Sequence, residues 1–313
     1  MAIIMKVFGK IFLFAIFILG VAKCFFVFGE DIYDFKPSGF AGSFYPMEKN
    51  SLDKMIEGYL EDAKTVRLKE GEKAIGFISP HAGYVYSGNV AAWVYKQFIN
   101  QEIDLIVIFG NSHHYYYEGA SLGFFKNYET PLGILGVDFH IIKRLLKRKS
   151  NILHFYPKAH LSDHCIEVQV PFIQKVKKNV KILPVLFGNG SFENVRKVVD
   201  IIWTEIENTN VVFVASTDLS HYHSYNEAVK IDKNTIEIIS ELDTSLFEKN
   251  YKTKKIELCG SCAVYALIYV AEKKQNCRFS VLKYANSGDV PNGNKKCVVG
   301  YLAGMITTIS NDE

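Results

Sequence analysis

Residues 105–114 read LIVIFGNSHH, an apolar run that ends abruptly in a polar turn and two histidines. A run of this length, bounded by Gly, Asn or Ser, is typical of a buried strand. The same order returns in residues 74–84, AIGFISPHAGY, and in residues 211–223, VVFVASTDLSHYH. The carboxyl ends of strands in an open α/β sheet line the ligand crevice, so we expect these distant histidines to converge. Imidazole is a common metal ligand and general base, which makes the three strand ends a candidate chemical site.

The rest of the chain alternates strand and helix patterns. Further short apolar runs predict strands, and apolar residues that recur with the helical period predict helices. This alternation predicts a single α/β domain in which helices flank a central sheet that is mixed or largely parallel. The predicted strands are 74–79, 105–109, 120–124, 180–187, 211–215, 279–284 and 298–308, and the predicted helices are 88–98, 139–147, 167–177, 192–206, 227–240 and 261–272, preceded by one that begins after Asn50-Ser51.

The composition is that of a globular protein, with 49% hydrophobic and 22% charged residues among 313. The net charge of +3 is small, and the basic residues are scattered. The densest basic stretch, residues 143–149, matches the solvated face and end of a helix. We therefore expect no nucleic-acid partner.

The amino terminus differs in kind from the rest of the chain. Lys6 and Lys10 precede residues 11–22, an unbroken apolar run, as in the charged and hydrophobic regions of a signal peptide. If the leader is not cleaved, the apolar stretch is just long enough for a single membrane anchor. We expect residues 1–29 to be a signal peptide or membrane anchor, and the domain at 35–313 to be exported or tethered outside the cytoplasm.

If Cys24 in the leader is left out, five cysteines remain: Cys165, Cys259, Cys262, Cys277 and Cys297. An odd number of cysteines in a chain of this size does not indicate a disulfide-stabilised fold. Cys277 with Cys297, and Cys259 with Cys262, are possible pairs, and at least one thiol should stay free. Cys259-Gly260-Ser261-Cys262 lies at a predicted helix start, where the helix dipole favours a thiolate. This spacing fits a redox pair, half of a zinc site or two buried cysteines. No second Cys-x-x-Cys exists, so the remaining metal use is one thiolate that joins histidines.

Two of the strand ends have local features that suit a ligand-binding turn. Gly83 permits a tight turn behind His81, and the phenol of Tyr84 lies nearby. At the second strand end, adjacent side chains point to opposite faces, so only one of His113 and His114 is expected to face the crevice. A single histidine at a strand end is more often structural. The recurrence of histidine after three predicted strands favours a functional site.

The third strand end and a further cluster offer groups that could handle protons. If a helix follows the strand, Asp218 and His221 share a face, and an Asp–His pair suits a general base or the support of a metal ligand. The alternative is that Asp218 caps that helix. The further cluster, residues 163–167, lies ahead of a predicted amphipathic helix. His164 and Glu167 are three residues apart and could meet on one face of that helix. Alternatively, Asp163 caps the helix.

Six motifs occur in order: Gly42-Ser43-Phe44-Tyr45-Pro46, Ser79-Pro80-His81-Ala82-Gly83-Tyr84, Gly110-Asn111-Ser112-His113-His114, Asp163-His164-Cys165-Ile166-Glu167 with the following residues to Phe172, Ser216-Thr217-Asp218-Leu219-Ser220-His221, and Cys259-Gly260. The set resembles the Memo family, called AmmeMemoRadiSam system protein B in prokaryotes. The resemblance runs from about residue 39 to 308, which is nearly all of the chain after the leader. Six motifs in register are far more specific than any single histidine.

The resemblance implies a single α/β domain similar to the class III extradiol ring-cleaving dioxygenases, with a mononuclear metal held by His81, His113 and Cys259. Iron is the expected metal, with copper or zinc as alternatives. The ring-cleaving enzymes use two His and one carboxylate. A thiolate in place of that carboxylate favours softer metals and puts oxygenase activity in question. Cys262, where the family more often has another residue, could oxidise with Cys259 into a disulfide and remove the ligand.

Asp218 and His221 match residues that line the family's pocket, and we expect them to be the catalytic, proton-handling groups. Four further residues are candidates for the pocket: His164, Glu167, Tyr84 and His114. The leading hypothesis is a metal centre with redox or oxidative activity on an unknown small molecule. The rival is a non-catalytic module that binds a peptide or partner protein in the same pocket, as animal family members are described to do. A thiol oxidoreductase is the third alternative.

Overall fold

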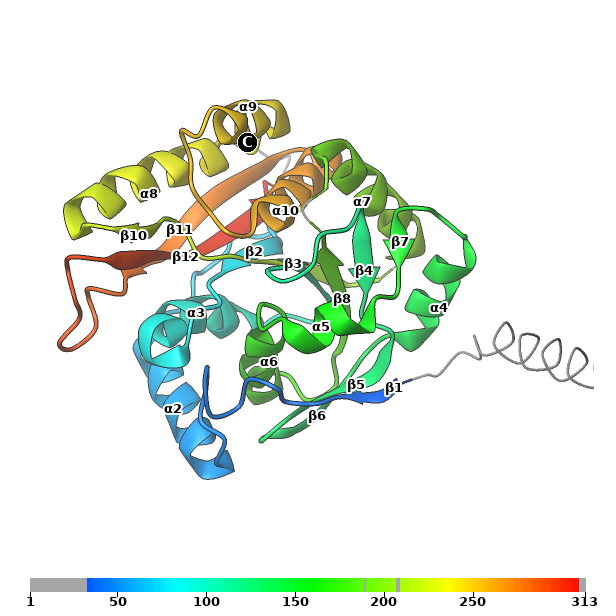
Figure 1. Cartoon of the computed structure of the whole chain (residues 1–313), viewed down its shortest axis with the longest axis horizontal. Coiled ribbons are helices and arrows are strands. Elements are labelled where there is room, and N and C mark those ends of the chain that lie inside the picture. The colour runs from blue at the N-terminus through cyan, green and yellow to red at the C-terminus, as the bar shows by residue number, and fades with distance from the viewer. Residues whose placement is uncertain (1–32, 189, 207–208, 310–313) are drawn as a thin grey trace, which may run out of the picture. The chain divides into compact units, whose positions relative to one another are not determined.

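The computed structural model describes residues 33–188, 190–206 and 209–309 (Figure 1). The predicted leader, residues 1–29, lies outside this part of the chain. From Asp34 onward, the described residues form one compact unit. Across the described residues, no helix combines the length and the apolar character needed to cross a membrane.

Within the described residues, a nine-stranded sheet organises this unit. Its strands are β2 (Ala74–Ser79), β3 (Leu105–Asn111), β4 (Ala120–Leu122), β7 (Leu153–His154), β8 (Lys181–Phe187), β9 (Val211–Ser216), β10 (His221–His223), β11 (Cys277–Asn286) and β12 (Val298–Thr308). The order is β10-β12-β2-β9-β3-β8-β4-β7, and β11 pairs with β12 (Figure 1). The four central strands β2, β9, β3 and β8 are parallel, whereas β12 and β4 border them in the antiparallel direction.

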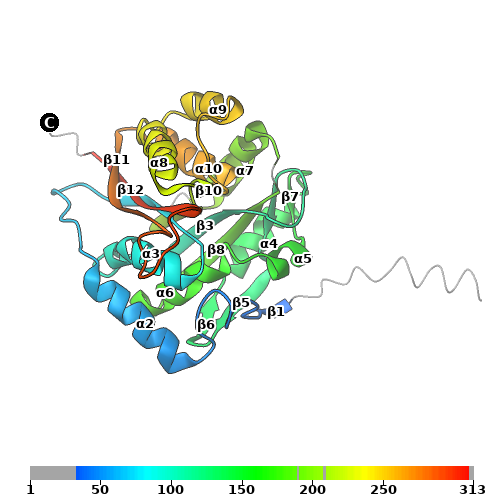
Figure 2. The same cartoon turned by 60° about the vertical axis from the view of Figure 1, so that its left-hand side comes forward.

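Helices cover both faces of the sheet. They are α2 (Lys49–Asp62), α3 (Tyr84–Phe98), α4 (Phe139–Lys147), α5 (Pro157–Ser162), α6 (Val170–Val176), α7 (Phe192–Ile206), α8 (Tyr225–Ser240), α9 (Thr244–Lys252) and α10 (Ser261–Lys274). Successive residues of a strand face opposite sides. A Cβ at Gly76 would lie 2.6 Å from Leu267, so α10 packs closely on one face. On the other face, the rings of Phe77 and Phe98 lie 5.1 Å apart, which places α3 there. Helices α2 and α6 lie beside α3, and α7 and α9 lie beside α10 (Figure 2).

A small second sheet holds the start of the described chain. It consists of β1 (Tyr33–Lys36), β5 (Phe125–Thr130) and β6 (Gly133–Gly136), in the order β1-β5-β6. The loop after β1 carries the Gly- and aromatic-rich residues 39–46 to the carboxyl ends of the central strands. The backbone N–H of Tyr84 donates to the carbonyl of Phe44 at 2.7 Å and fixes this loop beside the first histidine motif.

The predicted α/β class, with a mixed sheet between helices, is confirmed. The predicted bounds of β2, α4 and α7 agree with the structure. The hairpin β5–β6 and the helices α5 and α9 were missed. The predicted helix 167–177 is broken into a 3-10 turn, Glu167–Gln169, and α6, because Pro171 lacks a backbone N–H and suits only the first turn of a helix.

The helical turn that would place Asp218 and His221 on one face does not form. After β9 the chain passes into the short strand β10, which pairs with β12. The carboxylate of Asp218 accepts the backbone N–H of His81 at 2.8 Å and therefore does not cap a helix. A contact across the sheet has replaced the local hydrogen bond that the sequence suggested.

Candidate metal centre

Three strands that are neighbours in the sheet bring the histidine motifs together. Strands β2, β9 and β3 run parallel, with Ser79 opposite Ser216 and Phe109 opposite Ala215. Their carboxyl ends therefore meet at one edge of the sheet. The rings of His81 and His113, which follow β2 and β3, lie with their centroids 5.1 Å apart. The predicted convergence of the first two histidine motifs is confirmed.

A hydrogen-bond network fixes the orientation of the His81 ring. Its Nδ1 lies 3.0 Å from the hydroxyl of Ser216. That hydroxyl donates its single proton to the carbonyl of Cys165 at 2.6 Å and accepts an N–H of Gln169 at 2.8 Å. Because the hydroxyl has no second proton, it accepts from His81, and Nδ1 of the ring carries a proton. Nε2 is thus left to face the thiol of Cys259 at 3.0 Å.

The carboxylate of Asp163 orients the ring of His113 by holding its Nδ1, as Ser216 does for His81. The backbone N–H of His113 donates to Asp163 at 2.7 Å, and its Nδ1 lies 3.1 Å from the same carboxylate. The side chain of His113 is 27% exposed and that of Asp163 is 2% exposed. Burial alone would lower the pKa of His113, but its hydrogen bonds to Asp163 and Cys259 and their charges raise it to about 10. The metal-free ring therefore carries a proton on both nitrogens near neutral pH. Because Asp163 holds Nδ1, Nε2 is the nitrogen that would give up its proton to bind a metal ion.

The third candidate ligand, Cys259, lies in the loop before α10. The Sγ of Cys259 accepts the backbone N–H of Asp218 at 3.2 Å. Burial would raise the pKa of this thiol, but the charge of His81 and hydrogen bonds from His113 and His81 lower it to about 6. Gly260 allows the close approach, because a Cβ there would lie 2.6 Å from the carbonyl of Ser216. Cys259 is thus poised as a thiolate near neutral pH.

Two groups of side chains in the described residues could hold a metal ion. In one, single donor atoms of His81, His113 and Cys259 lie within 4.8 Å of one another. The other combines His113 with Asp163 and His164. The oxygens of Asp163 already accept hydrogen bonds from the His113 backbone and ring and from the Cys165 backbone. The first group is therefore the better ligand set, and Asp163 serves to orient one of its members.

Asp218 and His221 lie beside the group of ligands but do not form the expected pair. Asp218 is buried, and burial raises its pKa to about 6 against the lowering effect of backbone N–H groups of His81 and Ala82. The Nδ1 of His221 lies 2.7 Å from the carbonyl of Leu219, which only accepts, so the ring proton is on Nδ1. Its Nε2 has no hydrogen-bond partner within the described residues. His221 lines a cavity together with Cys259.

His164 and Glu167 lie close to the centre in different ways. The ring of His164 stacks on Phe44 at 4.3 Å and on His113 at 4.9 Å, and burial with the neighbouring histidine charges lowers its pKa to about 3. His164 is therefore a neutral wall of the site. Glu167 turns away from it and binds Lys36 and the hydroxyl of Tyr45, the latter at 2.6 Å. Its role is to anchor the loop that carries Phe44.

The last two predicted pocket residues lie outside the group of ligands. Tyr84 is buried and donates its hydroxyl to the carbonyl of Val168 at 2.6 Å. It lines a separate cavity of about 240 Å³ with the loop 42–46. His114 is exposed, next to His113 in the sequence.

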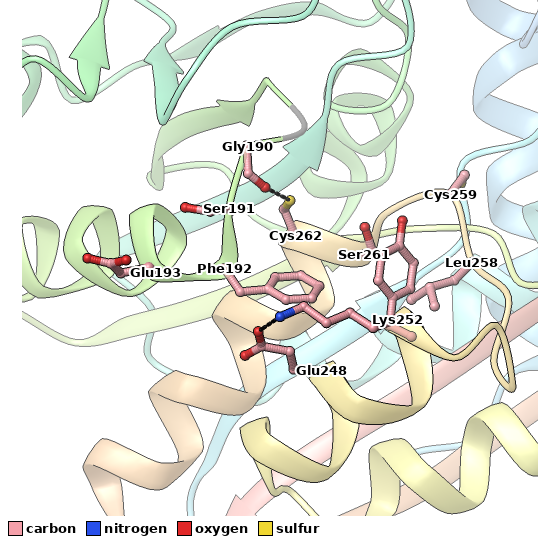
Figure 3. Close-up of a pocket in the computed structure, with 11 residues that line it drawn as sticks. Gly190, Ser191, Phe192, Glu193, Glu248, Lys252, Leu258, Cys259, Ser261 and Cys262 are labelled. Carbon is pink, nitrogen blue, oxygen red and sulfur yellow. Dashed lines mark hydrogen bonds and ion pairs between the residues drawn. The ribbon is translucent and has the colours of Figure 1, made fainter.

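Two cavities lie on either side of Cys259. One of about 630 Å³ is lined by the start of α7, by α9 and by Ser261 and Cys262 at the start of α10 (Figure 3). The other, of about 530 Å³, is lined by His221, Tyr251, Lys252, Lys254 and residues 256–259. Both include Tyr251, Lys252, Leu258 and Cys259. A ligand in either cavity would therefore reach the thiol.

A family model described as Memo-like protein matches residues 36–305. The chain belongs to the Memo family. A MEMO1 family protein of Methanosarcina mazei is 34% identical over 267 residues, and one of Nitrosopumilus maritimus is 32% identical over 266. Another, from Metallosphaera sedula, is 35% identical over 273 residues. Each of these alignments covers 84% of this chain and 96% of the relative.

Among solved structures, an uncharacterized protein of Escherichia coli K12 is similar to this chain with a TM-score of 0.48 and 11% identity. That match covers 76% of this chain and all of the other.

In this Memo-family chain the donor set fits a transition metal. Two imidazole nitrogens and one thiolate suit iron, copper or zinc and do not suit the hard cations magnesium and calcium. The second nitrogen of each ring is already held, by Ser216 or by Asp163, as is usual for metal-binding histidines. Cys259 lines both cavities, so this thiol connects the ligand set to them.

Sequence reasoning missed the residues that orient the ligands. Asp163 was taken only as a helix cap, and Ser216 and Gln169 drew no attention. The five described cysteines are all free, so neither possible disulfide is present. Cys165 is fully buried, and its thiol contacts the carbonyl of Asn111 at 3.5 Å. The predicted free thiol is confirmed.

Proposed function

We propose that this Memo-family protein binds one metal ion through His81, His113 and Cys259, and that the ion is iron, with copper or zinc as the alternatives. The observation that carries the proposal is that the three donors lie within 4.8 Å of one another. In both rings Nδ1 is held by a neighbouring side chain, which leaves Nε2 for the ion. A site that is already oriented loses little entropy when the ion binds.

We further propose a redox or oxidative activity on a small molecule that enters the cavities beside Cys259. The metal would supply an electrophilic and redox-active ion with coordination positions left open for a ligand. His221 presents Nε2 to the cavity as the group that accepts or returns a substrate proton. Asp218 holds the backbone of His81 and, with its pKa raised to about 6 by burial, can carry a proton near neutral pH.

Metal content after anaerobic purification tests the proposal. The wild-type protein is expected to hold about one iron, copper or zinc ion per chain, whereas His81→Ala and Cys259→Ser are expected to hold almost none. His140→Ala is the matched control, because this histidine is exposed on α4 and far in sequence from the ligands. Wild-type protein that binds none of the three metals after loading would overturn the proposal.

The size of the cavities supports a second candidate, a module that binds a peptide or partner protein without turnover. Two cavities of about 630 and 530 Å³ share one wall, so an extended ligand could pass over Cys259. Oxygen consumption with a panel of catechols separates the two functions. Turnover by metal-loaded protein that is lost in His221→Ala favours the enzyme. Peptide affinity without oxygen consumption favours the binding module.

A further inference from the structure

The metal centre leaves one buried sulfur unused. Cys262 lies in the first turn of α10, three residues after Cys259, and both line the cavity of about 630 Å³ (Figure 3). Its side chain is directed toward the carbonyl of Gly190, and the sulfur lies 3.9 Å from that oxygen. This contact is weak, and the thiol also interacts with Asn111 and Ser261.

Cys259 has the surroundings of a reactive thiol. Its Sγ lies 3.0 Å from Nε2 of His81 and accepts the backbone N–H of Asp218 at 3.2 Å. Donors at these distances stabilise a thiolate. Because Cys259 lines both cavities, a small oxidant can reach it. Cys165 offers the contrast, since it is fully buried and lines neither cavity.

We propose that Cys259 and Cys262 are a peroxide-reactive thiol pair whose oxidation to a disulfide removes the thiolate from the metal centre. In the first step the Cys259 thiolate attacks a hydroperoxide. The O–O bond breaks, and a sulfenic acid and one molecule of water or alcohol form. In the second step the Cys262 thiol attacks that sulfenic sulfur, the S–S bond forms, and water leaves. Two thiols are oxidised by two electrons in total, and one hydroperoxide is reduced.

The local backbone suits this closure. Cys262 is the second residue of α10, so no preceding helical turn restricts its side-chain rotation. Closure requires rotation about the Cα–Cβ bond of Cys262, which moves the sulfur away from the Gly190 carbonyl. The backbone next to Cys259 is held, because Gly260 donates its N–H to the Thr217 hydroxyl at 2.8 Å. The proposed closure therefore requires the side chain of Cys262, rather than the backbone at Cys259, to move.

The part of the proposal that concerns metal release rests on the proposed function, whereas disulfide formation does not. A bound metal occupies the lone pair that attacks peroxide, so the metal-bound form is protected. Oxidation therefore acts on the metal-free protein and keeps it metal-free until the disulfide is reduced.

Peptide mapping of the full chain tests the pair. Trypsin releases residues 256–273 as one peptide, which contains Cys259 and Cys262 and no other cysteine. After metal-free protein is treated with hydrogen peroxide and alkylated, this peptide is expected to be unalkylated and lighter by two hydrogen atoms. Cys262→Ser is expected to stop at the sulfenic acid, which dimedone traps on Cys259. Cys277→Ser, the matched control, is expected to close the disulfide as the wild type does.

Zinc binding supplies the second readout, because zinc has no redox chemistry of its own. Peroxide is expected to abolish zinc binding by the wild type, and dithiothreitol to restore it. Zinc added first should slow closure by about tenfold or more. Peptide 256–273 recovered with both cysteines alkylated after peroxide would overturn the pair. Closure in a chain that binds no zinc in any redox state would uphold the pair and count against the metal centre.

Discussion

The carboxylate of Asp163 holds His113 at two points, since it accepts the backbone N–H at 2.7 Å and lies 3.1 Å from the ring Nδ1. The two contacts fix both the backbone and the ring of the histidine. They also fix the proton on Nδ1, which leaves Nε2 as the metal-binding nitrogen. Asp163 also accepts the backbone N–H of Cys165 at 3.0 Å, so the carboxylate itself cannot rotate freely.

Asp163→Asn is expected to weaken zinc binding by about 10- to 100-fold, because the neutral amide orients the ring poorly and no longer raises its basicity. Competition against a coloured zinc chelator measures the change. Asp243→Asn is the matched control, because Asp243 caps α9 through the Leu246 N–H and Asn caps equally well. Equal affinities of wild type and Asp163→Asn would show that Asp163 does not orient a ligand.

The first two histidine motifs could be placed from sequence because parallel strands bring their carboxyl ends to one edge. His81 and His113 follow buried runs with unambiguous bounds, so their convergence needed no tertiary detail. Asp163 lies 50 residues from His113 in the sequence, and its local pattern is the same as that of a helix cap. Such a partner becomes visible only when the fold brings it near.

The third strand end shows a conflict between local and tertiary signals. Asp218 and His221 have the spacing of a helical pair, but the backbone N–H of His81 competes for the Asp218 carboxylate. Glu167 shows the same effect. Its spacing suggests a contact with His164, yet a cation and a phenol from residues 36–45 bind both of its oxygens. Neither competing partner can be read from the local sequence.

Gln169→Met is expected to lower the free energy of unfolding by about 3 kcal/mol, because buried partners lose their hydrogen bonds. The amide oxygen of Gln169 accepts the hydroxyls of Ser79 and Tyr95, and its nitrogen donates to Pro80 and Ser216. Urea denaturation measures the loss.

Gln101→Met is the control for this substitution. The Gln101 amide donates to one backbone carbonyl, that of Gln97, at 3.0 Å, and we expect a loss of about 1 kcal/mol or less. Similar losses in the two variants would mean that the buried network around Gln169 adds nothing beyond a single hydrogen bond.

Glu167→Gln is expected to destabilise the protein by about 3–5 kcal/mol, because it leaves the ammonium group of Lys36 buried without its counter-charge. Both side chains are almost fully buried. The double variant Lys36→Met/Glu167→Gln removes the orphaned charge and is expected to be more stable than Glu167→Gln alone. Thermal or urea denaturation of the wild type, the two single variants and the double variant measures the coupling free energy between the two side chains.

The exposed pair of Lys197 with Glu193 serves as the comparison for this ion pair. Its bond is 2.6 Å long, but the two side chains are 54% and 75% exposed, so Glu193→Gln is expected to destabilise the protein far less than Glu167→Gln does. If the double variant were as unstable as Glu167→Gln alone, the uncompensated charge would not be the cause of the loss.

His160 is expected to make the protein lose stability as the pH falls from about 6.5 to about 4. Its Nε2 donates to the carbonyl of Ser121 at 3.1 Å, and burial lowers its pKa from 6.5 to about 4. The unfolded chain therefore binds a proton in this window that the folded protein does not bind, and stability falls toward acid by about 3 kcal/mol in total. His160→Asn removes the titration, and urea midpoints between pH 7 and 4 should converge toward those of the wild type as the pH falls. Parallel profiles of the two proteins would contradict the neutral buried histidine.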